Sequence, residues 1–356
     1  MTQVDITSLI RNRVKSLKAY QVENFDCAIK LHANENAFPP PGEIMTQLAA
    51  KLRQLPLNRY PDPDSRRLKE ALGARLNQSP DRMMIGNGSD ELIQILLQIF
   101  CDPGDAVAFP DPTFAMYAIL SKGMGLQPVP YPLDEGWDFD ASSFLQTIAP
   151  QNPRMVFFSY PNNPTGNCFQ AEAIKEVLRE FPGIVVLDEA YHDFSRLSFL
   201  PELETHNNLI VLRSLSKIGL AGLRVGYGIA AKEIIHEVDK IRLPYNSNMV
   251  SQAFCETVLE NFEPVQQQID LIIKERDTLL AGLSGLPGVT AYPSAANFIL
   301  FRIPADSTGA FNELVSRGVL VRDLSGHPRL RQCLRVTVGT PEENSGFLQH
   351  LETVLR

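Results

Sequence analysis

The chain has 356 residues, 44% of them hydrophobic and 21% charged, so it is long enough for a large core and about two domains. Its net charge of −8, without a long basic run, argues against nucleic acid or an acidic membrane surface as a partner. Five scattered cysteines without a C-x-x-C pair, an N-terminus without a signal-peptide core and no apolar run of about 18 residues predict a cytoplasmic protein without a membrane span.

The first 42 residues are expected to form an N-terminal arm and part of a smaller domain, with a short helix at Ile6–Lys15. The stretch L-H-A-N-E-N-A-F-P-P-P-G, at Leu31–Gly42, has three prolines followed by glycine, which excludes regular structure. We therefore expect an extended segment there. Helices are predicted at about Glu43–Gln54 and Ser65–Leu76, on either side of the turn N-R-Y-P-D-P-D.

Residues 86–91, G-N-G-S-D-E, open a strongly apolar helix at Leu92–Phe100. The glycines permit a tight backbone, and either Ser89 or Asp90 can cap the helix. The free amides of such a helix start, together with the positive end of its dipole, form a ready site for a phosphate. An ordinary capped helix would show the same pattern.

Four later apolar runs are expected to be strands, each followed by a polar or aromatic motif. They are Ala106–Phe109 before P-D-P-T-F-A-M-Y, Met155–Ser159 before Y-P-N-N-P-T-G, Gly183–Leu187 before D-E-A-Y, and Leu209–Leu212 before S-L-S-K. With a helix at about Ala171–Arg179, this alternation predicts an α/β fold with a mostly parallel sheet and helices on both faces. In such sheets ligands bind at the carboxyl ends of the strands.

The stretch Ser214–Gly228 carries the clearest chemical signal. The amine of Lys217 can form a Schiff base with an aldehyde. The hydroxyls of Ser214 and Ser216, with the guanidinium of Arg224, can hold a phosphate. Because pyridoxal 5'-phosphate (PLP) carries both groups, the stretch suggests a PLP site, although a solvated lysine in a glycine-rich turn explains it equally well when taken alone.

Other strand ends supply the remaining contacts that PLP needs. Asp188 can pair with the pyridinium nitrogen and keep it protonated, so that the ring accepts electrons. Tyr191 and Asn163 can hydrogen-bond the ring oxygen O3', and Phe114 can stack on the ring face. The histidines show no metal-ligand spacing, so no metal is expected.

Residues 43–246 are expected to form the large PLP-binding domain, and residues 247–356 a smaller α+β domain. In the smaller domain, one or two helices are expected at 250–283, interrupted at Pro264. Strands are predicted at Asn297–Arg302 and Leu334–Val338, and helices at about Thr308–Ser316 and Glu342–Leu355.

From about Tyr20 onward, the chain resembles the fold-type I PLP-dependent aminotransferases, and among them the histidinol-phosphate aminotransferase family. The motifs that carry this resemblance are L-H-A-N-E-N at 31–36, R-Y-P-D-P at 59–63, G-N-G-S-D-E at 86–91, P-N-N-P-T-G at 161–166, D-E-A-Y at 188–191, S-L-S-K at 214–217, A-G-L-R-V-G at 221–226 and L-R-V-T-V-G-T at 334–340. The chain departs from the family at Phe114, where many relatives have tyrosine, and at Ala37, where proline is usual.

The resemblance implies a homodimer with shared active sites, in which Tyr60 reaches the PLP phosphate of the neighbouring subunit. It also implies that the substrate is bound by Tyr20, Asn34, Tyr245, Arg322 and Arg335. Arg322 and Arg335 match positions that grip a substrate phosphate. Surface ion pairing is the alternative, and it is less attractive for Arg335, which lies among apolar strand residues.

The implied reaction transfers the amino group of L-histidinol phosphate to 2-oxoglutarate, giving imidazole-acetol phosphate and L-glutamate in histidine biosynthesis. Lys217, Asp188 and Tyr191 would be the catalytic residues, with Lys217 as general base. An aromatic amino acid aminotransferase or a threonine-phosphate decarboxylase would share the PLP residues, so both stay open. A non-enzymatic PLP-fold protein is disfavoured, because Lys217 and Asp188 are both present.

Overall fold

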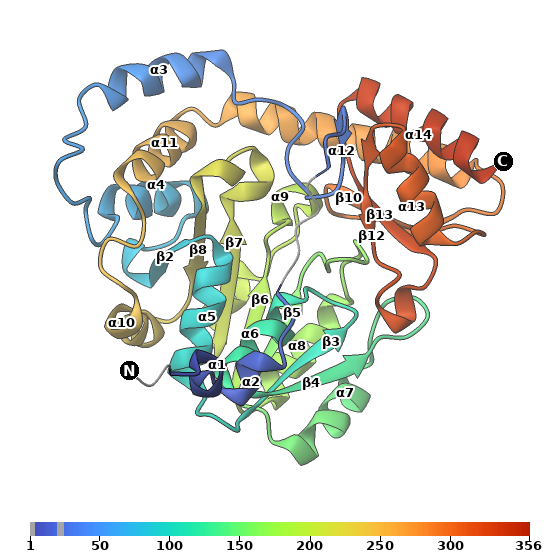
Figure 1. Cartoon of the computed structure of the whole chain (residues 1–356). Helices are drawn as coiled ribbons and strands as arrows, with labels where there is room; N and C mark the ends of the chain where they lie inside the picture. Colours follow the sequence, from blue (N-terminus) through green and yellow to red (C-terminus); the bar gives the residue numbers. More distant parts are fainter. Residues whose placement is uncertain (1–3, 20–24) are drawn as a thin grey trace.

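The computed structural model describes residues 4–19 and 25–356 and is built around a seven-stranded sheet (Figure 1). In spatial order the strands are β2 (Met83–Asn87), β8 (Val225–Ile229), β7 (Leu209–Ser214), β6 (Ile184–Asp188), β5 (Met155–Ser159), β3 (Ala106–Asp111) and β4 (Gln127–Pro132). The strands from β7 to β4 are parallel, whereas β8 is antiparallel to both of its neighbours. The carboxyl ends of β3, β5, β6 and β7 therefore meet at one edge of the sheet.

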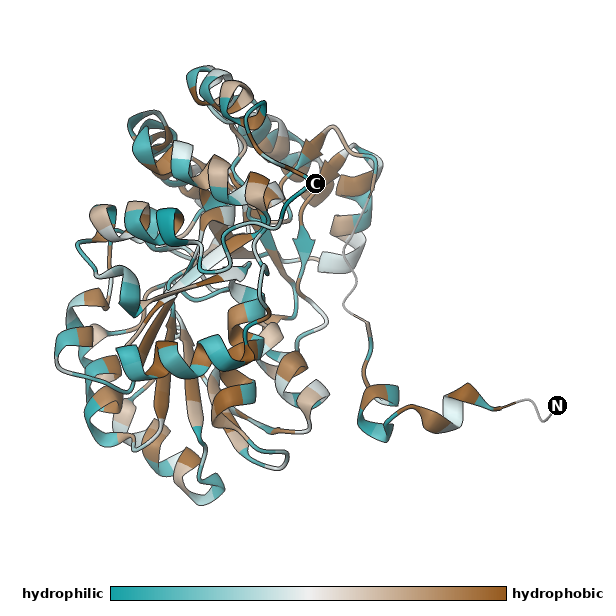
Figure 2. Ribbon diagram, turned by 90° about the vertical axis from the view of Figure 1, so that its left-hand side faces the viewer, coloured by the Kyte–Doolittle hydropathy of each residue, from teal (hydrophilic) through white to brown (hydrophobic). Residues whose placement is uncertain are grey.

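Both faces of this sheet are buried, as the alternation along β5 shows. Met155 and Phe157 belong to one hydrophobic core, and Val156 and Phe158 to the other. The first core is closed by α5 (Ser89–Phe100), α6 (Met116–Met124) and α10 (Lys232–Ile241); the second by α4 (Arg66–Leu76), α7 (Ala141–Ile148) and α8 (Ala171–Glu180). Figure 2 shows the hydrophobic strands enclosed by helices whose outer faces are hydrophilic. The predicted α/β class is confirmed.

A smaller antiparallel sheet follows in the C-terminal part of the chain. It runs β12 (Arg322–Asp323), β13 (Cys333–Thr337), β10 (Phe298–Arg302) and β9 (Thr290–Ala291), and it packs with α13 (Ser307–Ser316) and α14 (Pro341–Leu355). The N-terminal strand β1 (Ile29–Lys30) pairs in parallel with β11 (Val319–Leu320). A segment from the beginning of the chain therefore lies beside the C-terminal part.

Two consecutive helices link the two parts. α11 (Met249–Glu260) packs against α3 (Gly42–Leu52) and α4, whereas α12 (Glu263–Ser284) reaches α14 and β10. Pro264 occupies the first turn of α12, where a missing amide hydrogen costs no helical bond.

The remaining helices are short. They are α9 (His192–Ser195) and the 3-10 helices η1 (Pro80–Arg82), η2 (Ala149–Gln151), η3 (Leu200–Glu204), η4 (Leu215–Ile218), η5 (Ala221–Leu223) and η6 (Pro328–Leu330). The proposed domain boundaries stay predictions.

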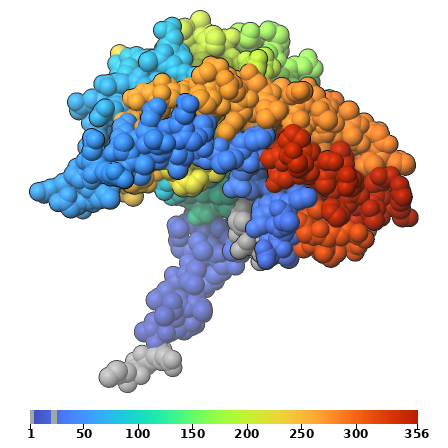
Figure 3. Space-filling view, turned by 90° about the horizontal axis from the view of Figure 1, so that it is seen from above, coloured from blue at the N-terminus to red at the C-terminus, as the bar shows by residue number. Residues whose placement is uncertain are grey.

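Some local predictions were wrong. The single helix expected at Ile6–Lys15 is two short helices, α1 (Ile6–Leu9) and α2 (Asn12–Lys15), because Ile10 is extended between them. Figures 2 and 3 show these helices projecting from the rest of the chain. Strand β8 was not predicted, because its glycines read as part of a turn. Among the described residues, no helix has the length and apolar character needed to cross a bilayer.

Candidate active site

Most of the residues expected to hold PLP line one cavity of about 450 Å³, at the carboxyl edge of the large sheet. They are Ser89, Asp90, Phe114, Asn163, Asp188, Tyr191, Ser214, Ser216, Lys217 and Arg224. The strand ends bring them together from positions more than a hundred residues apart in the sequence. Parallel strands place their carboxyl ends at a common edge, which is why motifs from separate strands share one cavity.

Asp188 ends β6 at the buried side of this cavity. Its Oδ2 accepts a hydrogen bond of 2.9 Å from the hydroxyl of Tyr117, and its Oδ1 accepts one of 3.2 Å from the amide of Ala190. Burial raises the pKa of Asp188 to about 6, although the hydrogen bond from Tyr117 opposes this rise. Because burial disfavours its charged form, the Asp188 carboxylate would be stabilised by a cationic ring nitrogen placed beside it.

Tyr191 lies beside Lys217, whose Nζ is 5.6 Å from the centre of the tyrosine ring. The Tyr191 hydroxyl accepts hydrogen bonds from Nδ2 of Asn34, at 3.0 Å, and from Nδ2 of Asn163, at 3.2 Å. Two donors fill the acceptor capacity of this oxygen, so its own proton points elsewhere. The hydroxyl is thus held in place and retains one hydrogen bond to donate.

Hydrogen-bond donors of the cavity gather where α5 begins. α5 begins there at Ser89, and no side chain caps its first amides, because the cap position is taken by Gly88 with φ of 84°. The prediction that Ser89 or Asp90 caps this helix is therefore wrong. Arg224 contributes its guanidinium, which donates to Ser216 Oγ at 3.4 Å and lies 3.4 Å from a carboxylate oxygen of Asp90.

Glycines allow this close approach. A Cβ atom at Gly88 would lie 2.6 Å from Nη2 of Arg224, and one at Gly226 would lie 2.3 Å from the backbone nitrogen of Ser89. Uncapped helix amides, hydroxyls and a guanidinium form a cradle of donors suited to a phosphate.

A second cavity, of about 970 Å³, adjoins the first and shares Phe114, Asn163, Tyr191 and Lys217 with it. Arg322 and Arg335 also line it, together with His32 and Asn34. Arg322 on β12 is the cross-strand partner of Arg335 on β13. Like charges placed directly opposite each other repel, which favours an anion between them.

Arg335 connects this second cavity to the first. Its Nη1 donates to Oδ1 of Asn163 at 2.6 Å, and its Nη2 donates to the carbonyl oxygen of His32 at 2.8 Å. Burial is the main cause that lowers the pKa of His32, and the positive charges of Arg322 and Arg335 lower it further against the opposing effect of Glu35. The neutral imidazole contributes no charge, so the positive charge beside this cavity comes from the two guanidinium groups.

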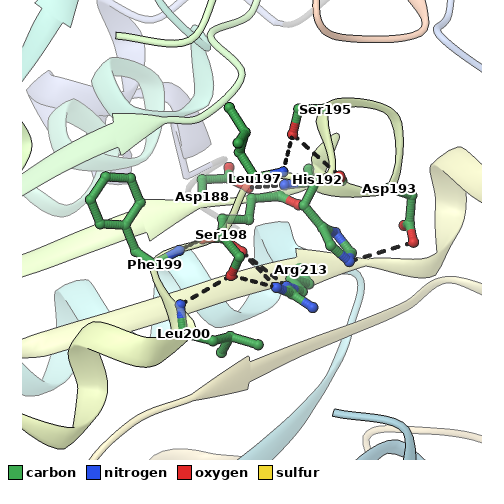
Figure 4. A network of polar contacts seen from close by, with 11 residues as sticks. Asp188, His192, Asp193, Ser195, Leu197, Ser198, Phe199, Leu200 and Arg213 are labelled. Carbon is green, nitrogen blue, oxygen red and sulfur yellow. Dashed lines mark hydrogen bonds and ion pairs between the residues drawn. The ribbon is translucent and has the colours of Figure 1, made fainter. Parts of the chain in front are cut away.

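Behind Asp188 lies a buried polar network (Figure 4). Nε and Nη2 of Arg213 donate to Oε2 of Glu189 at 3.0 and 2.8 Å, and Ser198 Oγ donates to the same oxygen at 2.9 Å. Arg213 precedes Ser214 and Glu189 follows Asp188, so this ion pair joins the ends of β6 and β7. It fixes the spacing between the carboxylate and hydroxyl sides of the cavity.

Two predicted residues lie outside both cavities of the single chain. Tyr60 and Tyr245 stack on each other with ring centres 4.4 Å apart, and 77% and 40% of their surfaces are exposed. Tyr20 lies outside the described residues.

Sequence reasoning missed Tyr117, the partner of Asp188, and His32. Tyr117 is the last residue of the P-D-P-T-F-A-M-Y stretch, about one helical turn after Phe114. Its place next to a predicted ligand-binding residue was the feature of the sequence that could have identified it.

The residues of the first cavity fit PLP by the chemistry of their donors. The uncapped amides of α5, the two serine hydroxyls and Arg224 suit its phosphate, and Asp188 suits its ring nitrogen. Lys217 also lines this cavity and supplies the amine. Phe114 offers a ring face for stacking.

The donors and the amine of this cavity are chemically suited to a phosphorylated aldehyde cofactor, and comparison with known proteins identifies the family. Residues 27–351 match the family model for class I and II aminotransferases, so the chain belongs to that family. It is 44% identical over 355 residues to histidinol-phosphate aminotransferase 2 of Nitrosococcus oceani, an alignment that covers 99% of each chain. It is 38% identical over 351 residues to histidinol-phosphate aminotransferase of Thermoanaerobacter pseudethanolicus, with 98% of this chain and 99% of that one covered.

Among solved structures, histidinol-phosphate aminotransferase from Sinorhizobium meliloti, in complex with PLP, has a TM-score of 0.88 to this chain. The two are 24% identical, and the match covers 98% of each chain, which shows the shared fold. The resemblance deduced from the motifs is therefore confirmed, both for the family and for the fold.

Proposed function

We propose that this chain transfers the amino group of L-histidinol phosphate to 2-oxoglutarate, with PLP as cofactor, giving imidazole-acetol phosphate and L-glutamate in histidine biosynthesis. One observation carries the choice of substrate. Arg322 and Arg335 face each other across neighbouring strands and line a cavity that also contains Lys217. A donor with a phosphate at one end and an amine at the other matches this arrangement.

Bound PLP supplies an electron sink for the negative charge that develops at the substrate α-carbon. Asp188 keeps the ring nitrogen protonated, and Tyr117 holds Asp188 through the 2.9 Å hydrogen bond. The amine of Lys217, which lines both cavities, would act as the general base that takes the proton from the substrate α-carbon. The hydroxyl of Tyr191, fixed by Asn34 and Asn163, would be free to donate its remaining hydrogen bond to the ring oxygen of the cofactor.

We further propose a homodimer in which the exposed Tyr60 reaches the cofactor phosphate of the other subunit. Tyr60 and Tyr245 form a stacked, exposed aromatic pair outside the cavities of their own chain. Exposed aromatic pairs are typical anchors of protein interfaces, because they bury a large area at low entropic cost.

A paired turnover assay tests the substrate assignment. Purified, PLP-loaded protein is given L-histidinol phosphate or L-phenylalanine as the amino donor, with 2-oxoglutarate as the acceptor. We expect a strong preference for histidinol phosphate. Equal or better use of phenylalanine would instead support the aromatic aminotransferase, and carbon dioxide release from threonine phosphate would support the decarboxylase.

Arginine variants sharpen this test. Arg322→Gln and Arg335→Gln each remove a charged donor to the phosphate, which corresponds to about a 10- to 100-fold loss in kcat/KM for histidinol phosphate. For Arg322→Gln, we expect turnover of phenylalanine to change much less, since that donor has no phosphate. An equal loss with both donors would contradict a phosphate role for Arg322.

A further inference from the structure

One loop of the C-terminal part of the chain is attached to the large sheet. Residues 324–332 connect β12 to β13, the neighbouring strands that carry the two arginines of the second cavity. In Figure 1 this loop extends from the small sheet toward the large one. Within it, His327 and Arg329 both contact Asp111, the last residue of β3.

The first attachment is a hydrogen bond between His327 and Asp111. Nε2 of His327 lies 3.0 Å from Oδ1 of Asp111, and its Nδ1 accepts a hydrogen bond of 3.3 Å from the backbone amide of Arg329. Since an amide N–H can only donate, Nδ1 carries no proton, and Nε2 donates its proton to the Asp111 carboxylate. Hydrogen bonds to a charged acceptor are stronger than those between neutral groups.

Arg329 forms the second attachment. Its Nη1 donates to the carbonyl oxygen of Asp111 and its Nη2 to that of Asp134, both at 3.3 Å. Its guanidinium carbon also lies 5.6 Å from the ring centre of Trp137. Asp134 and Trp137 follow β4, which pairs with β3. A single side chain therefore holds the loop against two neighbouring strands of the large sheet.

These attachments join two sets of residues that line the second cavity. One set follows the end of β3, and the other lies on the two strands or at the start of the loop. They are Thr113 and Phe114 in the first set, and Arg322, Leu324 and Arg335 in the second. We call Arg322 and Arg335 the arginine pair. His327 and Arg329 line neither active-site cavity, so they act on a bound molecule only through the residues that they hold.

We propose that His327 and Arg329 are positioning residues for the substrate. By holding the loop on the end of β3, they set how far the arginine pair lies from Lys217. A covalent chain of limited length joins the phosphate of the amino donor to its amine, so this separation determines how well both ends bind at once. The inference rests on the proposed function, in which the arginine pair binds the phosphate.

Steady-state kinetics of the PLP-loaded protein with L-histidinol phosphate test the role of His327. His327→Ala removes the hydrogen-bond donor and should raise KM about 3- to 10-fold with little change in kcat, because the phosphate and the amine no longer fit at the same time. His327→Gln keeps an N–H donor in place of Nε2 and should restore most of the parent KM. A parent-like KM in His327→Ala, or no recovery in His327→Gln, would overturn the proposal.

A matched pair of arginine variants tests the second attachment. Arg329→Ala removes the contacts with Asp111 and Asp134 and should raise KM as His327→Ala does. Arg331→Ala is the control, because Arg331 is an exposed residue of the same loop with the same charge, and it should keep the parent KM. Equal KM values in the two arginine variants would contradict the proposal. Should Arg329→Ala fail to fold by circular dichroism, the two His327 variants decide the question.

Binding of inorganic phosphate separates this inference from the proposed function. Calorimetric titration of PLP-loaded protein, in which the cofactor occupies the first cavity, measures phosphate binding at the arginine pair. Arg335→Gln should weaken this binding about tenfold or more, whereas His327→Ala should leave it unchanged, because the pair itself is intact. Binding that is no weaker in Arg335→Gln would overturn the phosphate role in the proposed function. An equal loss in His327→Ala and Arg335→Gln would overturn the positioning inference alone.

Discussion

At the scale of single residues, Asp188 is a carboxylate that the protein alone stabilises poorly. Its side chain is buried, and the two hydrogen bonds it accepts do not offset the loss of water, so its pKa rises from 3.8 to about 6. The folded, cofactor-free protein therefore favours the protonated form of Asp188. Protonation of this residue adds to the free energy of unfolding; the contribution is fully present below about pH 4 and is lost as the pH rises through about 6.

The first prediction concerns Asp188→Asn in the PLP-free protein. The amide cannot ionise but can still accept the hydrogen bond from Tyr117, so above pH about 6 the variant should unfold at higher urea concentration than the parent chain. The difference corresponds to about 3 kcal/mol at about 1.4 kcal/mol per pKa unit, and it should shrink toward pH 4. PLP affinity and turnover should both fall. Equal stability of the two proteins above pH 6 would show that burying the ionised Asp188 carboxylate does not destabilise the cofactor-free fold.

The second prediction concerns Lys217, which is half-buried between the two cavities. Lys217→Ala should keep the circular dichroism of the parent chain but lose the visible absorbance of bound PLP and turnover by several orders of magnitude. Lys232→Ala is the matched control, since Lys232 is an exposed lysine paired with Asp81. Full activity of Lys217→Ala would remove this residue from the catalytic machinery.

At the scale of elements, the cradle of donors at the start of α5 depends on how closely β8 approaches that helix. Gly226 is the second residue of β8, opposite Gly86 on β2 and Ser214 on β7. A Cβ atom there would lie 2.3 Å from the backbone nitrogen of Ser89 and 2.5 Å from the backbone carbon of Gly88. Backbone atoms cannot move aside as a flexible side chain can, so the glycine sets the position of the helix start.

The third prediction follows from this contact. Gly226→Ala should destabilise the fold by about 1–3 kcal/mol and weaken PLP retention, because the amides of α5 are pushed out of the cradle. Gly222→Ala is the control, since nothing lies within 4 Å of a Cβ atom at Gly222. Urea unfolding and PLP release on dialysis measure the two effects. Retention of PLP as tight as in the parent chain would mean that α5 does not hold the phosphate.

At the scale of the whole molecule, the proposed homodimer predicts that chains with different defects complement each other. Lys217→Ala and Tyr60→Ala proteins should each be inactive or impaired, and the Lys217→Ala defect lies in its own cavity. A hybrid dimer would contain one site with an intact Lys217 from one chain and an intact Tyr60 from the other. Mixing equal amounts under conditions of subunit exchange should restore about a quarter of the sites.

The control for this fourth prediction is a mixture of Lys217→Ala with Asp188→Asn. Both residues line the cavity of the same chain, so each subunit retains one defect in its own site and no hybrid site is complete. Activity should stay at the level of the single variants. Recovery in the control, or none in the Tyr60 mixture, would show that Tyr60 does not act across the interface.

The sequence by itself determined the α/β class, four of the seven strands of the large sheet and the residues that line the first cavity. Buried parallel strands read as continuous apolar runs, and each run is followed directly by the polar residues at its carboxyl end. Tertiary structure alone decided three other features: Gly226 lies in a strand of the large sheet rather than in a turn, Tyr117 donates to Asp188, and one cavity brings Trp137 together with Arg302 and Tyr292. Each of these depends on packing between segments far apart in the chain, which local pattern and propensity do not encode.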